Sequence, residues 1–153
     1  MSGKQQLIKV VTRIILPDGA KEQILQNAEG TLYLKENDYF LRYRDVNEED
    51  SGESWTTIKW PSLDNRDNKK QEVTIIRQGN VKMKQTFIEN QEELGYYHTP
   101  LGIFDIKTKT AHVEIQQNNQ EIHIEYQLWI NRQLAGQYQV KISYKDIPEK
   151  EKV

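Results

Sequence analysis

The sequence of 153 residues contains no cysteine, which excludes disulfides, thiolate catalysis and cysteine-ligated metals. No uncharged run approaches the roughly 18 residues that a membrane-spanning helix needs, and Met1–Gln6 lacks the apolar core of a signal peptide. The 21 basic and 23 acidic residues leave a net charge of −2, which gives no general attraction to nucleic acid or anionic lipid. We therefore expect a cytoplasmic protein that binds neither nucleic acid nor membranes.

Apolar residues are also scarce, because they make up 36% of the chain and the mean hydropathy is −0.85. A sheet with one face in water explains this, since only alternate residues of its strands need to be apolar. Eight tyrosines and three tryptophans supply large areas for a core or the rim of a pocket. The length suits one domain over residues 1–153, and we expect residues 1–4 and 146–153 to be frayed ends.

Alternation with a period of two residues predicts strands along most of the chain. It is clearest over 120–130, where Ile122, Ile124, Tyr126, Leu128 and Ile130 share one face. Turns at intervals of about ten residues are too short for crossover helices, so the strands form an antiparallel meander. The predicted strands are Leu7–Leu16, Gly30–Lys35, Asp38–Arg44, Trp55–Trp60, Val73–Arg77, Val81–Ile88, Glu92–His98, Leu101–Lys107, Ala111–Gln117, Gln120–Ile130 and Leu134–Tyr144.

Three segments lack this alternation. Ala20–Gln26 is compatible with a short helical turn or a wide loop, whereas Asp45–Ser54 and Ser62–Gln71 are polar and predict loops. A turn at Thr108–Lys109 is predicted to separate two of the strands.

The fold class that follows is all-β, with an antiparallel up-and-down meander of about eight to ten strands. Such a sheet has no helices to cover its inner face, so it closes into a β-barrel, with a two-sheet sandwich as the alternative. A barrel of this size holds packed side chains or one small ligand.

One set of residues carries a resemblance to a known family: Gly30, Tyr39, Tyr43, Thr56–Lys59, Arg77–Gly79, Met83, Phe87 and Tyr97–Gly102. With these residues the chain resembles the YwiB-like family of bacterial proteins of unknown function, which are lipocalin-like (calycin-type) β-barrels. The resemblance implies the fold and carries no activity.

The stretch Gly95–Ile106 predicts a sharp reversal between two aromatic strands. Pro100 has a fixed φ and no N–H, so the ladder should break there, and Gly102 permits a positive φ two residues later. We expect the neighbouring aromatic residues to lie at one end of the barrel.

From these patterns we predict a ligand-binding site and no catalytic site. Three scattered histidines lack the spacing of metal ligands, no serine lies in a nucleophile elbow, and no glycine-rich phosphate loop is present. The sequence therefore predicts neither a metal nor another cofactor. The expected ligand-binding residues are Tyr43, Arg77, Tyr97, His98, Phe104 and Tyr126.

Two functions remain open. The first is non-enzymatic binding of a small apolar or amphipathic ligand inside the barrel. The second is a packed barrel that binds another protein or forms a homodimer, which Trp129 on the polar face of its strand would favour. Large residues such as Met83, Tyr126 and Tyr138 filling the interior would support the second.

Overall fold

The computed structural model describes residues 3–45, 54–62 and 71–148, and it confirms the all-β barrel. The predicted loops fall largely on 46–53 and 63–70, which lie outside the described residues. Ten antiparallel strands close in the order β1-β10-β9-β8-β7-β6-β5-β4-β3-β2. The strands are β1 (Lys4–Ile15), β2 (Lys21–Lys35), β3 (Asp38–Asp45), β4 (Ser54–Pro61), β5 (Glu72–Gln78), β6 (Lys82–Ile88), β7 (Glu92–Thr99), β8 (Gly102–Gln116), β9 (Glu121–Ile130) and β10 (Gln133–Asp146).

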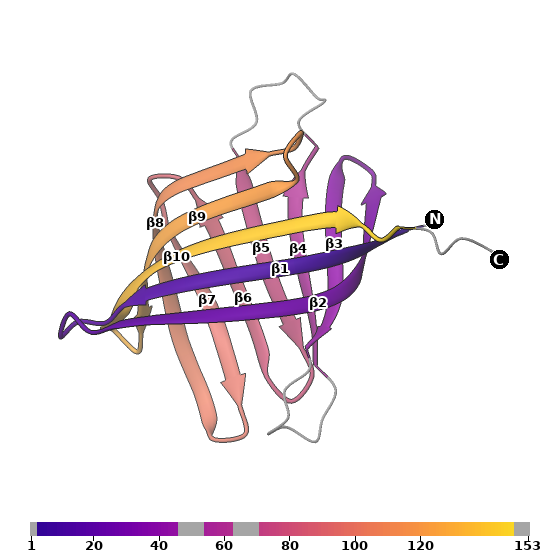
Figure 1. The fold of residues 1–153 in the computed structure, drawn as a ribbon. Helices are drawn as coiled ribbons and strands as arrows, with labels where there is room; N and C mark the ends of the chain where they lie inside the picture. The colour runs from indigo at the N-terminus through magenta and orange to yellow at the C-terminus, as the bar shows by residue number, and fades with distance from the viewer. Residues whose placement is uncertain (1–2, 46–53, 63–70, 149–153) are drawn as a thin grey trace.

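The barrel consists of two crossed layers (Figure 1). Strands β9, β10 and β1 run across one layer with parts of β8 and β2, while β3 to β7 form the other. Strand β2 links them, since it pairs with β1 from Lys21 to Leu32 but with β3 only over Gly30–Lys35. Its first half therefore has a partner on one side alone among the described residues.

The core is built from the inward side of each strand. Apolar side chains alternate with solvent-facing ones, and Leu41, Ile58, Val73, Phe87 and Ile122 are at most 1% exposed. Trp60 also lies here, with ring contacts to its cross-strand partner Tyr39 on β3 and to Tyr144 on β10. This pattern explains the low apolar content, because the outward residues are largely polar.

The interpretation of Ala20–Gln26 as a helical turn or loop was wrong. Residues from Lys21 onward belong to β2 and pair with β1 from Ile15 backwards. Lys, Glu, Gln and Leu favour helix locally, but pairing with a long neighbouring strand outweighs that weak preference.

The predicted turn at Thr108–Lys109 was also wrong, because β8 continues through it. Thr108 and Thr110 face inward at 2% and 1% exposure, so this polar stretch alternates as a strand does. A β-bulge between Thr110 and His112 shifts the register with β9, and β8 passes here from one layer to the other (Figure 1).

The ends are more ordered than the expectation for residues 1–4 and 146–153. Lys4 begins β1 and Asp146 ends β10, while residues 1–2 and 149–153 lie outside the described part.

Within the described residues no helix is present that has the length and apolar character to cross a membrane.

Candidate functional site

Four of the six predicted ligand-binding residues lie on one row across the barrel wall. The register pairs Tyr43 with Thr56, Thr56 with Arg77, and Arg77 with Met83. The row continues from Met83 to Tyr97 and from Tyr97 to Phe104. Directly paired residues point to the same side of a sheet, so Tyr43, Arg77, Tyr97 and Phe104 all face inward from neighbouring strands.

Asp45, at the end of β3, anchors the polar part of this row. One carboxylate oxygen accepts a hydrogen bond from Thr56 Oγ1 at 2.6 Å, and the other accepts one from Gln26 Nε2 at 3.2 Å. The Nε of Arg77 lies 3.3 Å from the same carboxylate as an ion pair. Arg77 Nε nevertheless makes no aligned hydrogen bond, so the contact is electrostatic.

Charge and burial differ sharply within this cluster. The Asp45 side chain is 9% exposed, whereas that of Arg77 is 35% exposed. Burial and then the charge of Asp45 raise the pKa of Tyr43 to about 12, so its hydroxyl is neutral at physiological pH. Arg77 is therefore the charged donor of this cluster, whereas the neutral Tyr43 hydroxyl is a buried O–H donor.

The interior is closed at one end and more open at the other. Near the turn that joins β2 and β3, Leu41, Ile58 and Trp60 are almost completely buried. Toward the opposite end Met83 and Tyr97 are partly buried, and Ile24, which faces inward from β2, is 54% exposed. This open end lies beside the half of β2 that β3 does not cover.

The structure separates His98 from the other predicted site residues. His98 pairs with Ile103, which is 73% exposed, so both point outward, and the His98 ring lies 5.0 Å from that of Tyr96. The expectation that His98 shares a site with Tyr97 was wrong, because adjacent strand residues face opposite sides.

Tyr126 faces inward but lies deep in the packed interior. Its ring centroid is 4.6 Å from that of Phe87 and 5.2 Å from that of Tyr138, and its hydroxyl is hydrogen-bonded to Gln85. Burial raises its pKa. The middle of the barrel is thus filled by aromatic side chains.

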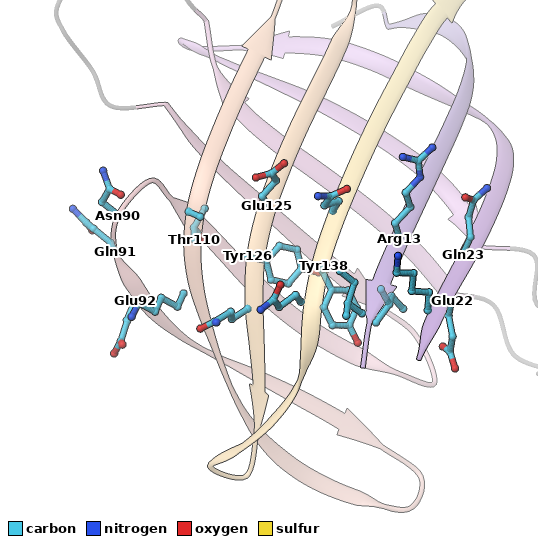
Figure 2. A pocket seen from close by; sticks show the side chains of 18 residues that line it. Arg13, Glu22, Gln23, Asn90, Gln91, Glu92, Thr110, Glu125, Tyr126 and Tyr138 are labelled. Atoms are coloured by element: carbon cyan, nitrogen blue, oxygen red, sulfur yellow. The ribbon is translucent and has the colours of Figure 1, made fainter. Parts of the chain in front are cut away.

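A separate groove of about 880 Å³ lies against β8, β9, β10, β1 and β2 (Figure 2). Its lining combines the outward-facing Arg13, Glu125 and Gln139 with the inward-facing Tyr126 and Tyr138, and it includes no residue of β3 to β6. It is distinct from the open end, because Arg77, Met83 and Tyr97 do not line it. Its side chains are mostly amides and charges of both signs.

A cluster of histidine and glutamate lies on the outer face near the bulge of β8. His112 Nδ1 is 3.0 Å from Glu89 Oε1, and its Nε2 is 3.2 Å from Glu114 Oε2. The hydrogen bond to Glu114 is the main cause that raises the pKa of His112. Among the described residues, no group of three or more histidine, aspartate or glutamate side chains is arranged to hold a metal ion.

Sequence reasoning missed Asp45, which it placed at the start of a loop. The sequence contains a clue, because the observed strand is one residue longer than the predicted Asp38–Arg44 and ends at Asp45. Residues two apart in a strand point to the same side, so Asp45 points inward with Tyr43. Met83 and Ile24 were likewise not assigned to the site.

Residues 8–142 match the family described as "Domain of unknown function (DUF1934)". The chain belongs to this family. It is 26% identical over 136 residues to the "Uncharacterized beta-barrel protein YwiB" of Bacillus subtilis (strain 168), covering 88% of this chain and 89% of that protein. The crystal structure of ywiB protein from Bacillus subtilis superposes with a TM-score of 0.75 and 23% identity, covering 95% of this chain and 94% of the other. The YwiB-like β-barrel is thereby established.

Proposed function

We propose that this protein is a non-enzymatic binder of a small amphipathic molecule at the open end of the barrel. The apolar part of the ligand would lie against Met83, Tyr97 and Phe104, and its polar part would accept hydrogen bonds from Arg77. The observation that supports this is the position of one half-exposed cation in a row of partly buried apolar side chains.

The buried carboxylate supports the same role for the arginine. Asp45 accepts hydrogen bonds from Thr56 and Gln26 and forms an ion pair with Arg77. The ion pair holds the guanidinium of Arg77 at this end of the interior. A planar guanidinium held in this way still has its terminal N–H groups for a carboxylate or phosphate. The aromatic filling around Tyr126 limits the ligand to this end of the barrel.

Calorimetric titration with three twelve-carbon amphiphiles below their micelle concentrations tests this proposal. Dodecanoate should bind more tightly than dodecanol, and dodecyltrimethylammonium should bind most weakly. Arg77→Gln should lower the affinity for dodecanoate roughly tenfold, which corresponds to the loss of one charge-assisted hydrogen bond. Arg77→Lys should lower the affinity less.

Lys84→Gln is the matched control, because Lys84 precedes Gln85 on β6 with the opposite orientation and is exposed. Each variant's thermal midpoint should be recorded, since Arg77→Gln removes the ion-pair partner of Asp45. Absence of saturable binding by all three amphiphiles would refute the proposal. So would equal affinity of the folded Arg77→Gln variant and the unchanged protein for dodecanoate.

A further inference from the structure

The outer face of the β7–β8 hairpin carries the most exposed large apolar side chains of the described residues. Leu94 is 82% exposed, Leu101 is 93% and Ile103 is 73%, with Tyr96 at 39%. In Figure 1 this hairpin extends past β2 at the lower end of the view. A cluster of this kind on one hairpin is typical of a contact surface.

The charges around this face have a particular order. On the row through Tyr96, Lys84 of β6 lies on one side and Asp105 of β8 on the other. Two strand spacings, about 10 Å, separate Lys84 from Asp105, which is too far for an ion pair within one molecule. Neither makes an ion pair with another described residue.

We infer that this face binds a second copy of the same chain, with a two-fold axis along β7. The rotation would bring β6 of each copy over β8 of the other. Lys84 of each molecule would then meet Asp105 of its partner, in two equivalent ion pairs. Leu94 and Tyr96 would meet their own copies on the axis, with Leu101 and Ile103 at the free end. The face is self-complementary, as a symmetric dimer requires.

Strand β9, which lies next to β8, does not add an exposed aromatic side chain to the dimer contact. Trp129 of β9 is half-buried, because Lys107 lies over its ring at 5.0 Å, and Lys107 also pairs with Glu92 at 3.7 Å. The apolar residues of the hairpin itself therefore form the contact that we infer, and Trp129 is less exposed than the sequence predicts.

Sedimentation velocity of the full chain across the micromolar range tests the inference. We expect a concentration-dependent dimer. Leu94→Asp and Ile103→Asp should each abolish it, and neither should change the thermal midpoint at concentrations where the unchanged protein is monomeric, because both side chains face water in the monomer. Leu34→Asp is the matched control, since Leu34 is 42% exposed but lies near the β2–β3 turn, and it should leave the dimer intact.

A charge swap identifies the pairing itself. Lys84→Asp and Asp105→Lys should each raise the dissociation constant at least tenfold, because each places like charges opposite one another twice. The double variant should return the constant to within about threefold of the unchanged protein. A monomer at every concentration overturns the inference, as does a dimer that responds neither to Ile103→Asp nor to the charge swap. Ligand binding at Arg77 is a separate measurement, so either proposal can fail without the other.

Discussion

Gly95 lies against the backbone of β6, and Gly95→Ala should destabilise the barrel strongly. A Cβ built at this position would overlap the carbonyl oxygen of Lys84 and would lie 3.2 Å and 3.3 Å from two side-chain carbons of Ile106. The carbonyl belongs to the backbone, so it cannot move aside without shifting the strand. The pairing of β6 with β7 covers only three residue pairs, and Gly95 directly precedes them.

We expect Gly95→Ala to lower the free energy of unfolding by about 3 kcal/mol, which is at the upper end for overpacking, because β6 and β7 must separate to make room for the methyl group. For a chain of this length that corresponds to a fall in melting temperature of about 6–12 °C. Urea unfolding followed by tryptophan fluorescence measures the free energy of unfolding directly. Gly19→Ala is the control, since a Cβ there has no neighbour within 4 Å and only its φ of 90° opposes alanine, at roughly 1 kcal/mol. A Gly95→Ala variant within about 0.5 kcal/mol of the unchanged protein would refute the close approach.

Three further perturbations test other parts of the structure. Gly102→Ala should cost on the order of 1 kcal/mol in urea unfolding through its φ of 148° alone, because the surrounding space is open; an unchanged midpoint would contradict this. Tyr126→Phe should cost about 1–2 kcal/mol, because the buried Gln85 loses its partner, and a neutral result would show that this hydrogen bond is not needed. His112 has a pKa raised by its hydrogen bond to Glu114, so its contribution to stability is present below about pH 6.5 and is lost as the pH rises through the raised value. Its side chain is 45% exposed, so the difference between the unchanged protein and His112→Ala should be below about 0.5 kcal/mol at pH 5 and vanish at pH 9; a difference that grows with pH would contradict the sign.

Alternation and turn chemistry were sufficient to predict the barrel, because each strand pairs with its neighbour in sequence. Ile122, Ile124 and Tyr126 were correctly placed on the inward face for this reason. The errors lie where local composition and tertiary pairing disagree. Lys21–Gln26 is rich in helix-forming residues, and its strand conformation depends on β1, which no local pattern reveals.

The same limit applies to the candidate site. The parity of Tyr97 and His98 within one strand was enough to show that they face opposite sides, yet both were assigned to one site. Tyr43, Arg77 and Phe104 share a row because of the register between their strands. Turn lengths alone do not determine that register, since a β-bulge shifts it by one residue. Asp45 was lost because its burial results from partners on β2, β4 and β5.

The most direct test of ligand binding uses the methyl group of Met83. The chain has two methionines, Met1 and Met83, so protein labelled with ¹³C at the methionine methyls gives one signal from the open end of the barrel and one from the N-terminus. Titration with dodecanoate should shift the Met83 signal to saturation and leave that of Met1 unchanged, and Arg77→Gln should move the midpoint to higher dodecanoate. A Met83 signal that stays in place, while calorimetry reports binding, would put the ligand elsewhere and contradict the account.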